Sequence, residues 1–388
     1  MKEKNSHLRV LFFLPYFYPY ISGITQYPYR LFTEQLEKMT ITCLTFRYRK
    51  ELISSFRLSP QCSVIRMPFL FRISKGFISP QSLFIFWNEL KKHDIVMLNI
   101  PSFEGVFLAL FAKLRKKPII SLLHSEVLLP PGTINRIINF ILNLGIRMQL
   151  ELSEKIIIYD MDYYENKPFY RRFINKMQIV LPPIHSEKPD IKYLDYLKKI
   201  NKQKICVGFC GRIAYEKGID ILIDAAKKIK DIHIFFAGPY GKNVVGEDEY
   251  FAQIKNKLAS SRTSYTLLGI LSDAQLSAFY KSIDMLVLPS INRTEAFGLV
   301  QIEAMFQGTP VIASNLPGVR VPIRLSHMGK VIPIEDSECL AKTIVEIHSH
   351  KSLYTNNDRV KKIRSMFGSQ NTYKTIYNLL SSYVKKNS

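Results

Sequence analysis

The chain has 388 residues, of which 54 are lysine or arginine and 32 are aspartate or glutamate, so its formal net charge is +22. This length predicts two domains of roughly 150–200 residues, and a hydrophobic fraction of 47% excludes a disordered chain. No window reaches the roughly 18 uninterrupted apolar residues of a transmembrane helix, and the charge favours polyanionic partners: nucleic acid, an anionic membrane or phosphorylated substrates.

The first apolar run, Val10 to Leu14, is interpreted as a buried strand. It is too short for the core of a signal peptide, and Pro15 and Pro19 interrupt the residues after it. We therefore expect a protein that is made and kept in the cytosol.

Short apolar runs alternate with amphipathic stretches, which is the pattern of parallel sheets covered by helices. The strands predicted in the first half span residues 9–14, 41–46, 94–100, 118–124 and 155–159. A polar, proline-bearing stretch near residue 182 is interpreted as a linker. The strands predicted in the second half span residues 205–211, 232–238, 265–269, 284–290 and 309–314. The expected fold class is α/β, with two Rossmann-like, doubly wound domains over residues 1–190 and 200–365 and a ligand cleft between them.

The five cysteines are odd in number and scattered, at positions 43, 62, 206, 210 and 339. Cys206 and Cys210 lie in a strand pattern with no second pair or histidine nearby, so we expect core thiols rather than a zinc site.

One helix of the second half is predicted to begin at a phosphate site. Gly308, followed by Thr309-Pro310, is a helix stop, which predicts a helix over residues 297–307. The small residue Gly298 leaves the first N–H groups of this helix open, so Gly298, Leu299 and Val300 are candidates for binding a phosphate.

Two glutamates flank that helix start. Glu295 precedes it, and Glu303 lies beside its apolar stripe, where a carboxylate is costly unless a group hydrogen-bonds to it. A pair of sugar hydroxyls is one such partner, and a basic residue of the protein is the structural alternative.

A second loop carries two cations. Gly211 lets the chain turn at a strand end, and Arg212 and Lys217 come after it, where together they could neutralise a diphosphate without a metal ion. Two solvated surface cations are the alternative interpretation.

The segments "GRIAYEKGIDILIDAAKKI" and "DMLVLPS…TEAFGLVQIEAMFQGTPVIASNLPG" together resemble the family 4 retaining glycosyltransferases of GT-B fold, densely over residues 205–318. The family's E-x7-E signature falls on Glu295 and Glu303. The resemblance implies transfer of a sugar from a nucleotide-diphosphate donor, UDP- or GDP-linked, to a hydroxyl. It assigns Arg212, Lys217 and the helix start to the diphosphate, Glu303 to the donor ribose, and Glu295 to the sugar. It implies no metal and no cofactor.

The resemblance extends to the first half. There it places Gly23 in the glycine loop near the donor diphosphate, and His124, at a strand end, near the transferred sugar. A satisfied core histidine is the alternative for His124. The family's C-terminal helix, here within residues 366–388, is expected to pack back on the first domain.

Three positions depart from the family pattern. Ser22 stands where most members have a first glycine, Tyr159 comes after the fifth strand where a serine is common, and Arg320 is followed by Val321-Pro322 without an acidic residue. An Asp-x-Asp pair, Asp160 and Asp162, is the arrangement that holds a divalent cation in the other large glycosyltransferase fold. We do not expect a metal site here, because such alternation is common by chance.

Leu52 to Asn88 contains no acidic residue and interleaves cations with aromatic side chains. Arg66, Arg72, Lys75 and Trp87 are therefore candidate contacts with an anionic membrane surface, while single-stranded nucleic acid and a simple core are the alternatives. Residues 133–150 form a second candidate, or a core helix.

The function expected is a retaining, metal-independent glycosyltransferase, peripheral on the cytoplasmic face of the membrane. Its acceptor is expected to be a lipid-linked glycan or a lipopolysaccharide or polysaccharide precursor, and no nucleic acid is expected to bind. The alternatives are a nucleotide-sugar epimerase or a phosphorylase on the same fold, or a polyanion-binding protein with a vestigial cleft.

Overall fold

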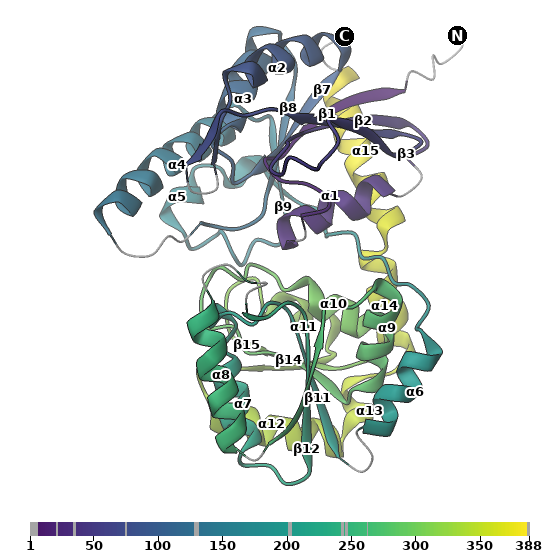
Figure 1. Cartoon of the computed structure of the whole chain (residues 1–388). Coiled ribbons are helices and arrows are strands. Elements are labelled where there is room, and N and C mark those ends of the chain that lie inside the picture. Colours follow the sequence, from purple (N-terminus) through teal and green to yellow (C-terminus); the bar gives the residue numbers. More distant parts are fainter. Residues whose placement is uncertain are drawn as a thin grey trace. The chain divides into compact units, whose positions relative to one another are not determined.

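The computed structural model describes residues 7–20, 22–33, 36–73, 76–127, 132–200, 204–241, 244, 247–261 and 263–385. The chain divides into two compact units (Figure 1). Met1–Pro183 and Ser369–Ser388 form the first unit, and Ile184–Gly368 form the second. Each unit contains a mainly parallel sheet with helices packed on it, so the predicted α/β class with two Rossmann-like domains is confirmed.

The first unit has an eight-stranded sheet in the order β10-β9-β8-β7-β1-β2-β4-β3. Neighbouring strands are parallel except β3 and β4, and the short strands β5 and β6 pair separately in an antiparallel hairpin. The strands are β1 (Leu8–Phe13), β2 (Met39–Phe46), β3 (Ser55–Ser59), β4 (Cys62–Met67), β5 (Phe71–Ile73), β6 (Gly76–Ile78), β7 (Ile95–Ile100), β8 (Ile119–Leu123), β9 (Lys155–Ile158) and β10 (Met177–Ile179).

The helices of the first unit are α1 (Gly23–Thr33), α2 (Pro80–Lys92), α3 (Gly105–Leu114), α4 (Thr133–Leu152), α5 (Pro168–Arg171), the 3₁₀ turn η1 (Ile174–Lys176) and α15 (Ser369–Lys385). The chain steps from β7 to β8 to β9 in one direction and from β1 to β2 in the other. Right-handed crossovers therefore put α3 and α4 on one face of the sheet and α1 on the opposite face. Helix α2 contacts α3, and α15 contacts α1.

The second unit has six parallel strands in the order β13-β12-β11-β14-β15-β16. They are β11 (Ile205–Cys210), β12 (Ile232–Ala237), β13 (Ser264–Gly269), β14 (Met285–Leu288), β15 (Val311–Ser314) and β16 (Gly329–Ile332). Its helices are α6 (Ile191–Ile200), the 3₁₀ turn η2 (Tyr215–Lys217), α7 (Ile219–Ala226), α8 (Asp248–Ser261), α9 (Asp273–Ser282), α10 (Leu299–Phe306), α11 (Val321–Ser326), α12 (Ser337–Ser349), α13 (Lys351–Tyr354) and α14 (Asn357–Phe367).

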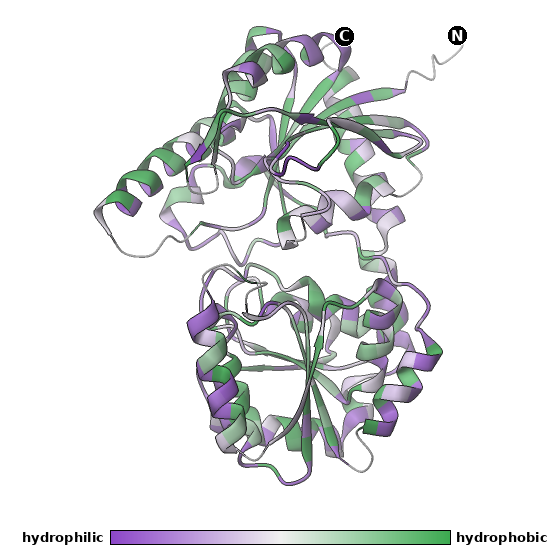
Figure 2. Cartoon of the chain, in the orientation of Figure 1, coloured by the Kyte–Doolittle hydropathy of each residue, from purple (hydrophilic) through white to green (hydrophobic). Residues whose placement is uncertain are grey.

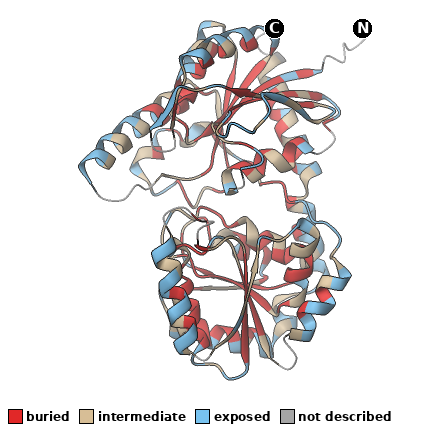
Figure 3. Cartoon of the chain, in the orientation of Figure 1, coloured by how far each residue is buried: buried red, intermediate tan, exposed pale blue. Residues whose placement is uncertain are grey.

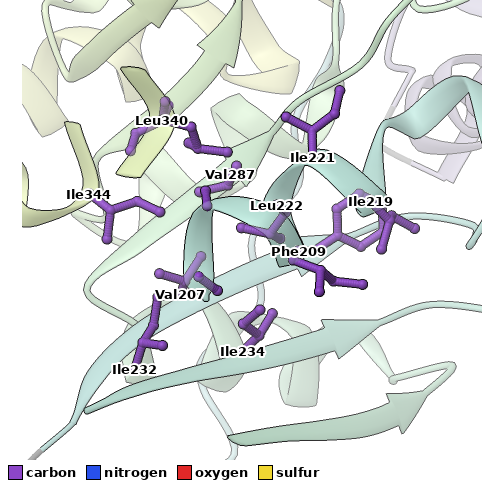
Figure 4. Close-up of a cluster of buried hydrophobic side chains, with 14 of the residues drawn as sticks. Val207, Phe209, Ile219, Ile221, Leu222, Ile232, Ile234, Val287, Leu340 and Ile344 are labelled. Atoms are coloured by element: carbon purple, nitrogen blue, oxygen red, sulfur yellow. The ribbon is translucent and has the colours of Figure 1, made fainter. Parts of the chain in front are cut away.

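Buried residues concentrate in the strands of both units (Figure 3). All residues of β7, β8 and β12 are buried, as expected for parallel strands that are covered on both faces. In the second unit, α7 and α12 pack their apolar stripes on β11, β12 and β14 (Figure 4), with Leu222, Val287 and Leu340 among the buried side chains.

The stretch predicted as a linker is in part a helix. α6 begins at Ile191 and packs on α9 through the buried side chains of Leu194 and Leu197, so residues 184–200 belong to the second unit. The polar residues of this stretch suggested a linker, but Lys192, Lys198 and Lys199 lie on the exposed face of an amphipathic helix. No helix in the described part of the chain is both long enough and apolar enough to cross a membrane.

Candidate functional site

The loop after β11 is shaped by a glycine. Gly218 has a φ of 63°, in the left-handed region, and a Cβ added there would lie 2.2 Å from the carbonyl oxygen of Pro289. The Ile291 N–H also donates to the carbonyl oxygen of Glu216, at 3.1 Å. Residues 215–218 are therefore held directly against the segment that comes after β14.

This contact brings together two of the predicted site residues. Lys217 Nζ donates a hydrogen bond to Glu295 Oε2, and the side chains are only 17% and 15% exposed. Both residues lie beyond the carboxyl ends of their strands, β11 and β14, which are neighbours in the sheet. Ligands of open α/β sheets bind at that edge. A half-buried cation and carboxylate are thus positioned together where a substrate is expected.

Arg212, the second predicted diphosphate contact, lies in the same loop. Its side chain is 54% exposed, and its guanidinium group donates to Glu216 Oε1 at 2.8 Å. Because an exposed ion pair contributes little to stability, this guanidinium group can exchange its partner at small cost.

The predicted helix start is observed slightly later than expected, at Leu299. Gly298 caps α10 with a φ of 77°, and a Cβ there would lie 2.5 Å from Leu288 Cδ2. The N–H groups of Leu299 and Val300, in the first turn of α10, have no acceptor within the helix. They come soon after Glu295 in sequence, so a helix terminus and the Lys217–Glu295 pair belong to one segment of the second unit.

Gln301 is a residue that sequence reasoning missed. It is fully buried, and its Nε2 donates to the carbonyl oxygens of Phe297 at 2.9 Å and Val319 at 2.8 Å. It therefore ties the start of α10 to the loop after β15. The signal in the sequence was a polar amide on the apolar face of a short helix, which needs internal partners.

Glu303 has the hydrogen-bonding partner that its position demanded. Tyr280, a buried residue of α9, donates its hydroxyl to Glu303 Oε2 at 2.7 Å. Burial, together with the nearby Cys210 and Glu303, raises the pKa of Tyr280 well above its usual value, so this hydroxyl stays a donor. Glu303 is half-buried, and the hydrogen bond from Tyr280 holds its Oε2 in place.

In the first unit, His124 lies immediately after β8 and is buried. Its Nε2 contacts Asn99 Oδ1 at 2.5 Å, and its Nδ1 is hydrogen-bonded to the hydroxyl of Tyr159. Burial lowers the pKa of His124 to about 3, so the imidazole is neutral at physiological pH. Three neighbouring strand ends, those of β7, β8 and β9, thus meet in one polar network.

Tyr27, from α1, extends this network. Its ring stacks on Tyr159 with centroids 5.6 Å apart, and its buried hydroxyl has no hydrogen-bond partner among the described residues. The helix that carries it begins at Gly23, where an added Cβ would meet nothing within 4 Å. Space is therefore open at the predicted glycine loop, and Ser22 Oγ accepts from the Thr25 N–H at 3.3 Å beside it.

The Asp-x-Asp pair is used in part to shape its own loop. Asp160 is buried, and its Oδ1 accepts from the Tyr163 N–H at 2.9 Å. The described residues contain no group of three His, Cys, Asp or Glu side chains arranged to hold a metal ion.

One predicted membrane contact is wrong. Arg66 is buried, and its guanidinium group donates to the carbonyl oxygens of Ile53 at 2.9 Å and Tyr18 at 2.7 Å. It lies on the same face of β4 as the buried Cys62 and Val64, which a count of charges could not reveal. Arg72 lies exposed on β5, and Trp87 is half-exposed on α2 with Arg115 3.7 Å above its ring. Lys75 lies outside the described residues.

Comparisons with known proteins bear on both units. Residues 197–364 match the family model of the glycosyl transferases group 1. An uncharacterized 41.2 kDa protein in the cps region of Klebsiella pneumoniae is 29% identical over 230 residues, 58% of this chain and 58% of that protein. A D-inositol 3-phosphate glycosyltransferase of Mycobacterium sp. strain KMS is 34% identical over 146 residues, 37% of this chain and 32% of that protein.

The fold matches over a longer range than the sequence does. The structure of HepE from Anabaena in complex with UDP has a TM-score of 0.74 at 17% identity, covering 97% of this chain and 100% of that one. By sequence, the chain spans 58% and 32% of the length of the two relatives. The likeness to HepE therefore concerns the fold over nearly the whole chain, whereas the family model matches residues of the second unit.

Proposed function

Because residues 197–364 match the family model of the glycosyl transferases group 1 and the fold resembles that of HepE over 97% of the chain, we propose that this protein is a retaining glycosyltransferase of GT-B fold. It transfers a sugar from a nucleoside-diphosphate donor to a hydroxyl group of an acceptor. The observation that carries the proposal is the Lys217–Glu295 pair beside the start of α10.

The pair supports a specific exchange of partners. Without donor, Lys217 and Glu295 neutralise each other. When a donor binds, the Lys217 ammonium turns to the diphosphate, and the Glu295 carboxylate is released to accept hydrogen bonds from hydroxyls of the sugar. Each charge therefore has a partner in both states, which avoids leaving a half-buried charge unpaired.

Departure of the nucleoside diphosphate builds negative charge on the β-phosphate. Lys217, Arg212 and the N–H groups of Leu299 and Val300 would stabilise that charge, because they are held in place before the reaction begins. Glu303, whose Oε2 accepts a hydrogen bond from Tyr280, is the residue proposed to bind the donor ribose. These cations and N–H groups are the reason to propose that no metal ion is needed.

In the first unit, Gly23 and His124 are the residues proposed to face the donor and acceptor. Both nitrogens of the neutral His124 imidazole are already hydrogen-bonded, to Asn99 and to Tyr159, so His124 would orient a hydroxyl by giving up one of these partners, without adding charge. The acceptor proposed is a lipid-linked glycan or a polysaccharide or lipopolysaccharide precursor at a membrane surface, which the charge of +22 supports.

The proposal is tested by calorimetric titration of the full chain with UDP, GDP and ADP in the presence of EDTA. UDP is the first choice, because HepE was solved in complex with it. Binding of one nucleotide without metal, lost in Lys217→Ala, is the expected result. Binding that requires Mn²⁺ would contradict metal independence, and no binding in either condition would overturn the proposed function.

A further inference from the structure

The first unit exposes a large apolar surface on its helical layer. On α4, Ile134, Ile137, Phe140, Ile141 and Leu144 are all exposed, Ile134 by 75% and Phe140 by 70%. On α3, Phe107, Leu110 and Leu114 are exposed, and on α2 so are Phe84 and Trp87. We call these ten residues the α2–α4 face. Single exposed apolar residues are ordinary on soluble proteins, but a set of this size marks an interaction surface.

Helix α4 has an unusual division along its length. No residue from Thr133 to Leu144 is buried, whereas the last part of the helix packs through Ile146 and Leu150 (Figures 2 and 3). Ile134, Ile137, Ile141 and Leu144 recur at the spacing of one helical stripe. The first three turns of α4 therefore form an amphipathic segment whose apolar stripe has no partner within the described residues.

The three helices form one continuous layer. Helices α3 and α4 approach closely at Gly145, where an added Cβ would lie 3.1 Å from Val106 Cγ2. Helices α2 and α3 are joined by Trp87, whose ring meets that of Phe111 edge-on at 5.5 Å. Phe107, Leu110, Phe111 and Leu114 share the outward stripe of α3, so the apolar residues of neighbouring helices adjoin one another.

The charges around this surface are mostly positive, although Glu151 at the end of α4 and Glu154 just after it pair with Arg147 and Lys113. Between Leu52 and Leu150 the chain has twelve basic residues and only four acidic ones, and every one of the four is engaged. Glu89 and Asp94 are paired with Lys92 and Arg9, Glu126 with Lys167, and buried Glu104 accepts from the Phe77 N–H. The cations next to the apolar stripes include Arg136 on α4 and Lys116 after α3, both exposed.

We propose that the α2–α4 face docks on an anionic lipid bilayer, with the first three turns of α4 lying in the interface and the surrounding cations on the lipid headgroups. Buried apolar side chains and attraction to anionic headgroups together give such segments their affinity. A second copy of the chain is a poorer occupant, because pairing two such faces would bring like charges together. This inference rests on the proposed function in one respect, because both place the acceptor at a membrane.

The test is co-sedimentation of the full chain with vesicles of phosphatidylcholine alone and of phosphatidylcholine with phosphatidylglycerol. The test variant is Ile137→Ser/Phe140→Ser on α4. The matched control is Ile191→Ser/Leu353→Ser, which removes two equally exposed apolar residues from α6 and α13 of the second unit. Circular dichroism, UDP titration and size-exclusion chromatography are recorded for every protein.

We expect the wild type and the control to bind only the anionic vesicles, more weakly at high salt, and the α4 variant to bind at least about tenfold more weakly with its UDP affinity unchanged. Equal vesicle binding by the α4 variant would overturn the inference, as would a wild type that binds UDP but no vesicles. A wild-type dimer that the α4 variant converts to a monomer would show instead that a second copy covers the face. Vesicle binding without UDP binding would leave the docking surface standing while overturning the proposed function.

Discussion

Lys217 donates a hydrogen bond to Glu295, a residue 78 positions further along the chain. The two residues meet because β11 and β14 are neighbours in the sheet and because Gly218 lets the intervening loop lie against Pro289. The cation predicted to bind the diphosphate and the carboxylate predicted to bind the sugar thus form an ion pair before any donor is present.

We expect Lys217→Ala and Glu295→Ala each to lower turnover by ~10²-fold or more, as loss of a preorganised charged group does. Steady-state kinetics with the donor identified by titration is the measurement. Lys227→Ala is the matched control, because Lys227 forms an exposed pair with Asp224 at 3.1 Å on the same unit and should leave turnover unchanged. Near-normal turnover in either test variant, with the fold intact, would remove that residue from the proposed mechanism.

Gly218→Ala is expected to destabilise the second unit and weaken donor binding. The alanine would have to keep a φ of 63°, and its Cβ would lie 2.2 Å from the Pro289 carbonyl oxygen. The loop that carries Lys217 therefore has to move. Gly269→Ala is the control, since Gly269 has a φ of 70° but nothing within 4 Å of an added Cβ. We expect about 1 kcal/mol for the backbone strain in Gly269→Ala and clearly more for Gly218→Ala, measured by urea unfolding. Equal losses would show that the close approach is unimportant.

Gln301→Leu tests a positioning residue rather than a catalytic one. The variant leaves the carbonyl oxygens of Phe297 and Val319 buried without their donor, which costs about 1–3 kcal/mol of unfolding free energy per group. We expect weaker UDP binding in addition, because the start of α10 loses its tie to the loop after β15. The control is Gln307→Leu. Gln307 lies at the other end of α10 and its amide donates to Ser186, so this variant should change neither the affinity for UDP nor the loop after β15. Unchanged UDP affinity in Gln301→Leu would limit Gln301 to a structural role.

The buried imidazole of His124 predicts a pH dependence of stability. Its pKa is about 3 in the folded chain and about 6.5 when unfolded, so the unfolded state binds the proton first as the pH falls. Its contribution to the free energy of unfolding is complete above pH 6.5 and is lost progressively between about 6.5 and 3, by an amount on the order of a few kcal/mol. The His124→Gln variant should therefore lose less stability than the wild type when urea midpoints are compared from pH 7 to pH 4. Parallel pH profiles for the two proteins would contradict the buried, neutral state of His124.

Local patterns were enough to predict much of this protein. Apolar runs separated by amphipathic stretches predicted the two α/β units, because a strand covered on both faces must be mostly apolar, as β7, β8 and β12 are. The glycines at 298 and 308 bounded a short helix for the same local reason, since both positions have φ values that side chains disfavour. The strand β4 was missed because Ser63 and Arg66 interrupt its apolar run.

The sequence by itself thus determined the type of each unit and the candidate residues of the site, since backbone preferences and periodicity act over a few residues. Only the tertiary structure decided which charges meet and which side chains face the solvent. The order of strands paired Lys217 with Glu295, and the packing of one face of β4 buried Arg66 together with Val64. It also left the first turns of α4 uncovered, although their apolar pattern fits a core helix equally well. Burial depends on which elements become neighbours, and that is a property of the whole fold.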